Sequence, residues 1–336
     1  MMSFIPSQSP QPIPAPAKSR GLSLLFAVVK WILFLVVLAL VVRALAKQFA
    51  QIDFRTVHVQ PLMVAMAILS MLMVPIVQLV SYRILLSAYA HQPPWRALAA
   101  SVWVPILGKY VPGKVASVAG VIYLLKKFQI PIAIAFSVVL VLDGMMAVSG
   151  LMLGAPLLLS GPVKHLLPQG WIAAAGVVAC GLVCLHPRVF GWVTNFVLKK
   201  MKREPLDHMP DLKHYLVPVI CVFSQWVLAG MSLWCVARSV TATPAAQIPT
   251  FISIAGLAYT ISYLALFAPG GIGVREAIFL TTLHQIVGLG SDAAIVVVGI
   301  RVVQIFVEIL CVLAGMVILK TFVHEPAGFL ASNTTR

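Results

Sequence analysis

The sequence is poor in charged residues, and above all in acidic ones. Only 10% of its 336 residues are charged, and Asp and Glu together number 9. Soluble domains carry roughly 25% charged residues. With 61% hydrophobic residues and a mean hydropathy of +1.01, this chain has too few polar side chains to cover a surface in water. We therefore expect it to be solvated by lipid.

The sequence also lacks the motifs of common catalytic and cofactor sites. G-x-x-x-x-G-K-[ST], H-E-x-x-H, G-x-S-x-G and D-D-x-x-D are absent, and the histidines are scattered. Nucleotide, zinc and diphosphate–magnesium chemistry are therefore not indicated. Five cysteines lie in apolar stretches, where Cys180 and Cys184 could share a helix face without further ligands to complete a metal site. We expect no cofactor and no enzymatic activity.

The net charge of +15 would suggest nucleic acid in a soluble protein. Here the basic residues lie mostly between apolar segments, where they match topology signals and anionic lipid headgroups. Nucleic acid is therefore not an expected partner, whereas membrane lipids are.

Long apolar stretches fill most of the chain, and none shows the alternation of a membrane β-barrel. Crossing a bilayer takes ~20 mostly apolar residues in a helix. Six stretches qualify as full spans: Leu22–Val42, Pro61–Tyr82, Ile132–Ser160, Trp171–His186, Tyr215–Ala237 and Asp292–Leu319. Two more, 96–125 and 249–288, are interrupted by Pro-Gly. The predicted fold is an all-α membrane bundle of six full spans and two re-entrant Pro-Gly hairpins.

The ends of the chain are predicted to be tails. Residues 1–20 are rich in proline and suggest a disordered cytoplasmic segment, 21–320 form the transmembrane domain, and 321–336 form a cytoplasmic tail. Short loops with positive charge lie in the cytoplasm. The basic segment 187–214 therefore fixes a topology with both termini in the cytoplasm of a multi-pass plasma (inner) membrane protein. The segment 43–60 is an exception, since its basic residues would face outward.

Spacing around the two Pro-Gly breaks suggests an inverted repeat. Pro112 precedes Asp143 by 31 residues, and Pro269 precedes Arg301 by 32. By the topology above, the first hairpin opens from the cytoplasm and the second from outside, which is typical of inverted-repeat transporters. Repeat 1 is expected over about 21–160 and repeat 2 over about 171–320.

Several polar residues interrupt the apolar spans. Charges in a bilayer cost ~2.5–3.5 kcal/mol each on insertion scales and usually mark function or pairing. Arg301, Gln304 and Glu308 share one helix face, which should therefore point into the protein. Under a two-fold axis Asp143 and Arg301 could approach each other. They would form either a structural ion pair or a polar path whose partners change as it opens.

The first hairpin tip has the sequence G-K-Y-V-P-G-K. Its candidate binding residues are Lys109, Tyr110, Pro112, Gly113 and Lys114. Lysine beside an opened helix end suits a phosphate headgroup. The alternative is that both lysines only reach toward the membrane surface and set topology.

The second tip has the sequence A-P-G-G-I-G-V-R-E. Its glycines make a turn whose backbone N–H groups could face an anion, and the arginine could hold phosphate bidentately. Glutamate at the start of the returning helix favours its dipole. The candidate residues are Pro269, Gly270, Gly271, Gly273, Arg275 and Glu276.

Together the two tips resemble the lysylphosphatidylglycerol synthase/flippase-type transmembrane family, over roughly residues 20–320. The resemblance implies a polytopic inner-membrane protein that moves or presents lipids, in some members hopanoid or polyprenol-linked ones. Lys114 departs from the small or aromatic residue usual there. No aminoacyl-transferase domain is expected after the last span. The positions that match the family's pattern are Pro112, Gly113, Asp143, Pro269, Gly270, Gly271, Gly273, Glu276 and Arg301.

Three functions are compatible with these features. The first is a flippase or transporter for a phosphate-bearing or polyprenol/hopanoid-type lipid, driven by an ion gradient or by the lipid's own gradient. The second is an enzyme acting on membrane lipid, which the missing motifs disfavour. The third is a non-catalytic subunit that supports a separately encoded glycosyltransferase or other lipid-modifying enzyme.

Overall fold

A computed structural model describes residues 59–110, 115–160, 169–206, 212–265 and 268–324, and these consist of helices and short connections without a β strand. The expected tail 1–20, the span Leu22–Val42 and residues 325–336 lie outside the described residues. The elements are α2 (Pro61–Ser87), α3 (Trp95–Trp103), η1 (Val104–Tyr110), α4 (Val115–Lys127), α5 (Ile132–Gly154), η2 (Ala155–Leu159), α7 (Gly170–Cys184), α8 (Pro187–Lys200), α9 (Leu212–Val240), η3 (Ala245–Gln247), α10 (Ile248–Leu264), η4 (Pro269–Gly271), α11 (Val274–Thr282), the π-helical turn η5 (Leu283–Val287) and α12 (Asp292–His324).

Five stretches of helix are long and apolar enough to cross a membrane. They are Pro61–Ser87, Ile132–Leu159, His214–Val240, Ala245–Leu264 and Asp292–Thr321. The pair α7–α8 would make a sixth span, but it is bent by 67°. The prediction of a multi-pass helical membrane protein is therefore confirmed, and four of the expected full spans coincide with long helices.

Two details differ from the expected layout. The stretch Trp171–His186 forms the 15-residue helix α7, which is short for a span on its own, and half of the expected loop 187–214 is the helix α8. Proline is favoured in the first helical turn, and Pro187 starts α8 after the bend. In addition, α10 is long enough to span by itself, although it was expected to be half of a hairpin.

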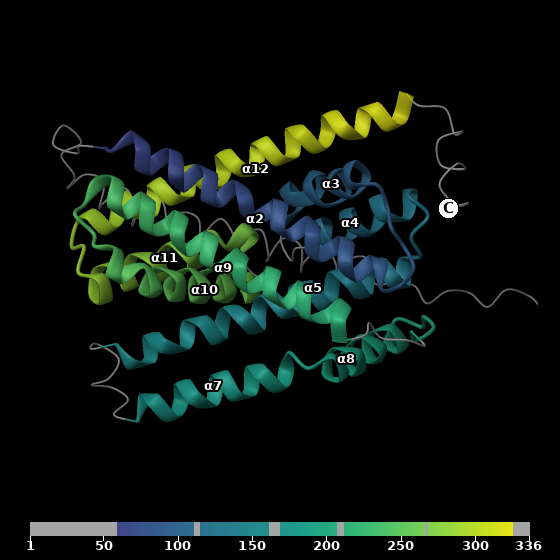
Figure 1. Ribbon diagram of the computed structural model, residues 1–336, viewed down its shortest axis with the longest axis horizontal. Coiled ribbons are helices and arrows are strands. Elements are labelled where there is room, and N and C mark those ends of the chain that lie inside the picture. Colours follow the sequence, from purple (N-terminus) through teal and green to yellow (C-terminus); the bar gives the residue numbers. More distant parts are fainter. Residues whose placement is uncertain (1–58, 111–114, 161–168, 207–211, 266–267, 325–336) are drawn as a thin grey trace, which may run out of the picture.

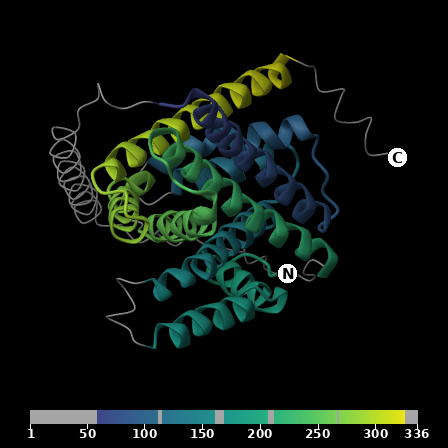
Figure 2. The same ribbon diagram turned by 60° about the vertical axis from the view of Figure 1, so that its left-hand side comes forward.

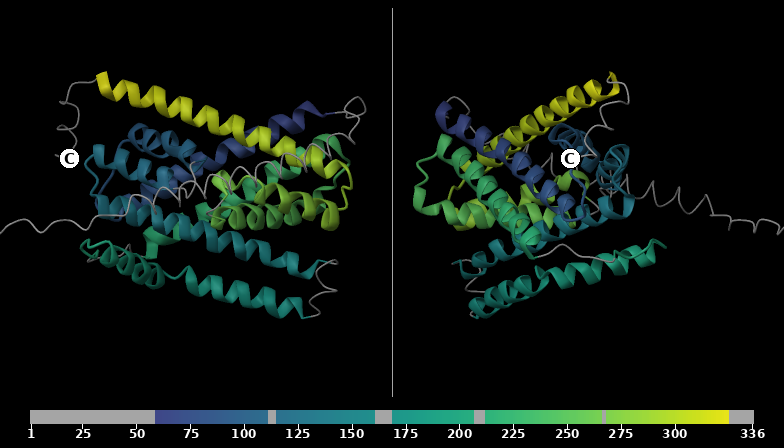
Figure 3. Two further views of the ribbon diagram at one scale, coloured as in Figure 1. Left: turned by 180° about the vertical axis from the view of Figure 1, so that it is seen from behind. Right: turned by 45° about the vertical axis from the view of Figure 1, so that its right-hand side comes forward.

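The helices are arranged around α2, α9, α5 and α10. The long helices α2 and α9 pack along each other, and α10 packs against both α5 and α9. The views in Figures 1 and 2 show α3 and α4 at one end of the bundle and α10 and α11 at the other. Helices α7 and α8 form an outer layer against α5, on the side away from α12 (Figure 3).

Small residues let the central helices approach closely. A Cβ added to Gly150 of α5 would lie 2.9 Å from the backbone oxygen of Gly256 in α10, and the reverse contact is equally short. Lipid provides no hydrophobic drive for helices to associate, so close van der Waals packing of this kind holds them together. Trp226 of α9 adds a hydrogen bond from its indole Nε1 to the hydroxyl of Ser149, at 2.9 Å. These contacts fix the walls of a central cavity.

Candidate functional site

The two interrupted helices meet at the centre of the bundle. The end of η1 contacts η4, and a Cβ added to Gly270 would lie 2.6 Å from the ring of Tyr110. Gly270, Gly271 and Gly273 have φ values of 63°, 70° and 91°, a region that side chains other than glycine rarely adopt. The glycine-rich sequence thus allows both the tight turn and the close approach of the first tip.

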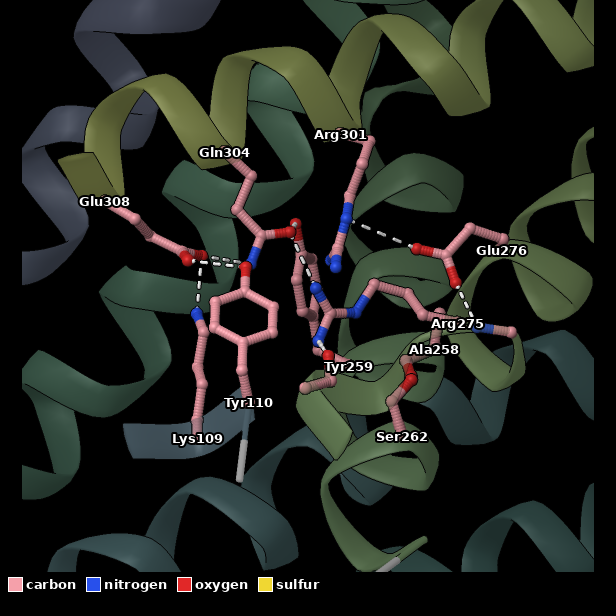
Figure 4. Close-up of polar contacts among 12 residues, drawn as sticks. Lys109, Tyr110, Ala258, Tyr259, Ser262, Arg275, Glu276, Arg301, Gln304 and Glu308 are labelled. Atoms are coloured by element: carbon pink, nitrogen blue, oxygen red, sulfur yellow. Dashed lines mark hydrogen bonds and ion pairs between the residues drawn. The ribbon is translucent and has the colours of Figure 1, made fainter. Parts of the chain in front are cut away.

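A carboxylate on α12 joins both tip residues of η1 (Figure 4). Glu308 lies 2.5 Å from the ammonium of Lys109 and accepts a hydrogen bond of 2.9 Å from the hydroxyl of Tyr110. We call Lys109, Tyr110 and Glu308 the latch. Because Glu308 is buried, with 8% of its surface exposed, its charge depends on these partners.

The latch continues into the second tip through an amide. Gln304 donates to Glu308 from Nε2 at 2.6 Å and accepts a bond of 2.6 Å from Nη1 of Arg275. Nη2 of Arg275 donates to the backbone oxygen of Gly270 at 3.2 Å. The guanidinium also lies over the ring of Tyr259, 4.3 Å from its centroid. One polar network therefore joins both tips and α12 (Figure 4).

A second ion pair lies beside this network. Glu276 accepts a bond of 2.6 Å from the backbone N–H of Gly273, which caps the start of α11. Its other oxygen lies 3.6 Å from Nε of Arg301. In this structure Arg301 thus pairs with Glu276. That Asp143 and Arg301 approach each other stays a prediction.

A cavity of about 330 Å³ opens against the network. It is walled by residues from both halves of the chain, among them Lys109, Asp143, Arg275 and Glu308. Asp143 interacts with Tyr263 of α10, which also lines the cavity. Apolar side chains of α2, α5 and α9 make up much of the remaining wall. The cavity is thus amphipathic, as suits a molecule with a polar head and an apolar tail.

Two guanidinium groups each keep one buried donor atom without a partner. Among the described residues, Nε of Arg275 and Nη1 of Arg301 are buried without a hydrogen-bond partner. A buried donor left without a partner costs about 1–3 kcal/mol. Arg275 lines the cavity and is only 8% exposed. Such donors are suited to an anionic ligand, since charge-assisted bonds to phosphate or carboxylate are strong.

The charges at the tips favour an anion as well. At the tips and on α12, Lys109, Arg275 and Arg301 face two carboxylates, Glu276 and Glu308, which leaves one net positive charge; Asp143 adds a third carboxyl group elsewhere on the cavity wall. Within the described part of the chain, no group of three His, Cys, Asp or Glu side chains could hold a metal ion. The unpartnered N–H donors of Arg275 and Arg301 are available to an anion.

The structure describes most, but not all, of the candidate residues predicted from the sequence. Pro112, Gly113 and Lys114 lie outside the described residues, and only the backbone of Pro269 is described. The remaining candidates gather at the cavity or in the network next to it. Sequence reasoning found Tyr110 but missed the two tyrosines of α10. Tyr259 and Tyr263, four apart on α10, support Arg275 and Asp143, and two aromatic hydroxyls shortly before a glycine-rich break were the available signal.

Comparison with known families agrees with this geometry. A family model described as the lysylphosphatidylglycerol synthase TM region matches residues 22–315. The chain belongs to this family. The match includes both interrupted helices and the whole polar network, so the resemblance carried by the two tips is confirmed. Among curated proteins, none matches the chain. Family membership and five or six apolar helices together identify a multi-pass membrane protein compatible with a lipid-related role.

Proposed function

We propose that this family member is a lipid flippase or lipid-presenting transporter of the inner membrane. Its substrate would be a phosphate-bearing lipid, such as a phospholipid or a polyprenol-linked lipid, with its headgroup in the central cavity. The free buried Nε of Arg275 on the cavity wall carries this proposal, because it is a donor held ready for an anion. The apolar wall formed by α2, α5 and α9 would accommodate the start of the lipid tails.

We further infer that the chain is built as an inverted repeat. The succession α2, α3–η1, α4, α5 corresponds to α9, α10–η4, α11, α12 in order and type. Both first helices carry, within their last five residues, an arginine that donates to a backbone oxygen of the following linker, Arg83 to Pro93 and Arg238 to Thr243. Inverted repeats support alternating access because each half can take up the conformation of the other.

The latch would then act as a gate between the halves. Lys109 and Tyr110 belong to the first half, whereas Glu308 belongs to the second. An anionic headgroup that bound Lys109 and Arg275 would compete with Glu308 for these cations. Loss of the latch would separate η1 from α12 and open a path, in which Asp143 and Arg301 would exchange partners. The end with most basic residues would face the cytoplasm, together with both termini.

Transport can be tested in liposomes that contain the purified full-length chain. Fluorescent phosphatidylglycerol, a fluorescent polyprenyl phosphate and fluorescent phosphatidylcholine would be scored by access to dithionite. We expect faster equilibration of the anionic lipids with wild type. Arg275→Gln should slow it at least tenfold, and Lys320→Gln, an exposed charge change at the end of α12, should leave it unchanged. Equal dithionite-accessible fractions with and without protein would refute transport of those lipids.

The alternative is an accessory subunit for a separately encoded glycosyltransferase or other lipid-modifying enzyme. Under it the cavity would present a lipid without moving it, and Arg275→Gln would impair lipid binding in a liposome assay that shows no flipping by wild type. Neither proposal assigns a catalytic step to this chain.

A further inference from the structure

Helix α8 carries two large aromatic side chains on its outer face. Trp192 and Phe196 are 69% and 57% exposed, and their rings stack at 5.8 Å with an angle of 18° between the planes. The opposite face packs inward through Phe190 and Leu198. Because α8 is bent by 67° from α7, it does not continue the direction of that helix. A short bent helix with an exposed aromatic face is typical of helices that lie in the membrane interface.

Basic residues surround this aromatic face. Arg188, Lys199 and Lys200 are exposed on α8 itself, and Lys202 and Arg203 follow directly after it. Trp and Tyr rings next to Lys and Arg mark the level of the lipid headgroups. The same combination recurs on α4, where the ammonium of Lys127 lies 4.9 Å from the ring centroid of Tyr123, which is 59% exposed.

A hollow of about 690 Å³ lies between the segment after α8 and the start of α5. Its cations come from two separate parts of the chain, Lys126 at the end of α4 and Lys202 with Arg203 after α8. Glu204 is the acidic residue among its lining. The start of α5 has no side-chain cap, so its first N–H groups add positive potential at this place. The hollow is distinct from the central cavity, with which it shares no lining residue.

We propose that α8 and this hollow form a binding surface for anionic phospholipid, at the end of the bundle where α4 and α8 end and α5 begins (Figure 1). Trp192 and Phe196 enter the boundary of the acyl chains. Lys126, Lys202 and Arg203 bind the phosphate groups. The occupant is a bilayer lipid because the apolar and basic parts lie next to each other on a helix of an integral membrane protein. Charge complementarity selects anionic over zwitterionic headgroups.

A packing contact between α8 and α5 connects the lipid-binding surface to the central cavity. The ring of Phe190 on α8 packs directly on Gly144 of α5, where a Cβ would collide with it. The neighbouring residue Asp143 lines the cavity. Lipid bound to α8 therefore holds the part of α5 that carries this carboxylate. The binding surface itself does not depend on the proposed transport, because its test measures lipid retention.

The first experiment measures lipid affinity of the full-length protein in detergent micelles. Dioleoyl phosphatidylglycerol and dioleoyl phosphatidylcholine are titrated separately, and bound lipid is counted by native mass spectrometry. Each Lys or Arg near an anionic surface contributes about a fivefold factor in affinity. The variant K202Q/R203Q should therefore bind phosphatidylglycerol about 30-fold more weakly, with affinity for phosphatidylcholine unchanged.

Two controls keep this result interpretable. K202R/R203K keeps both charges and should retain binding. R96Q/K320Q removes two exposed charges elsewhere and should change affinity less than threefold, provided that all variants unfold at the temperature of wild type. Equal affinity for both lipids, or an equal loss in R96Q/K320Q, would overturn the proposal. A loss in K202R/R203K as large as in K202Q/R203Q would also overturn it.

The second experiment measures depth in vesicles of phosphatidylglycerol and phosphatidylcholine. Nitroxide labels are attached at F196C or K202C in full-length protein whose five native cysteines are replaced by alanine. We expect the label at 196 to be relaxed mainly by oxygen, which concentrates in the acyl region. The label at 202 should be relaxed mainly by a water-soluble nickel chelate. Nickel access at 196 equal to that at 202 would overturn the placement of α8 in the interface.

Discussion

The sharpest test of the polar network is Glu308→Gln. This change keeps the size of the side chain and an oxygen that can still accept from Tyr110, but it removes the charge that faces Lys109 at 2.5 Å. Lys109 would then remain near Arg275 and Arg301 without its carboxylate. The variant therefore isolates the electrostatic part of the latch from its packing.

The expected loss of stability in Glu308→Gln follows from how deeply the Lys109–Glu308 pair is buried. Removing one partner of a buried ion pair costs about 3–5 kcal/mol, because the other charge is left uncompensated. The side chain of Lys109 is 25% exposed and that of Glu308 10%, so this partial exposure to solvent reduces the effect. We therefore expect Glu308→Gln to lower the free energy of unfolding by about 2–3 kcal/mol, below that buried range because of the screening.

The assay is a double-mutant cycle in mixed micelles. Unfolding of wild type, E308Q, K109Q and K109Q/E308Q is followed by circular dichroism during titration with SDS. The double variant should be more stable than the sum of the two single losses predicts, by about 2 kcal/mol, because it removes both charges together. E204Q, which removes an exposed carboxylate, should stay within about 0.5 kcal/mol of wild type. A coupling energy near zero would refute the assignment of Glu308 as the counterion of Lys109.

Three further changes test the neighbouring contacts. Gly270→Ala would place a methyl group 2.6 Å from the ring of Tyr110 at a φ of 63°, so it should destabilise the protein by at least about 1–3 kcal/mol in the same SDS titration. The control is Gly176→Ala on α7, where a Cβ meets nothing within 4 Å; it should be neutral or stabilising by up to about 1 kcal/mol. An equal loss of stability in Gly270→Ala and Gly176→Ala would contradict the contact between Gly270 and Tyr110. Tyr110→Phe removes only the hydrogen bond to the latch carboxylate and should cost about 1 kcal/mol, whereas no change would show that this bond contributes nothing. Arg301→Gln should destabilise the protein more than the double change Arg301→Gln/Glu276→Gln, since the single variant leaves a buried carboxylate unpaired; the opposite order would exclude the ion pair as a stabilising contact.

Much of the secondary structure could be predicted from the sequence because it is determined locally. In lipid a helix satisfies its own backbone hydrogen bonds, so an apolar run of sufficient length is enough to predict α2, α5, α9 and α12. The break before α11 was equally local, since Pro269 and three nearby glycines exclude a continuous helix. The amphipathic helix α8 was missed because 14 residues with charges at both ends do not meet the criteria for a span.

The sequence by itself determined a lipid-solvated helical chain, two interrupted segments and a polar face on α12. Only the tertiary structure decided the partners: Glu276 for Arg301, and the latch across 198 residues between Tyr110 and Glu308. Nearly every polar group at the site could have formed a hydrogen bond or ion pair with several others, and spacing along the chain does not predict which pairs form. The choice of partners depends on how closely the glycines allow η1 to approach η4, which is a property of packed backbones.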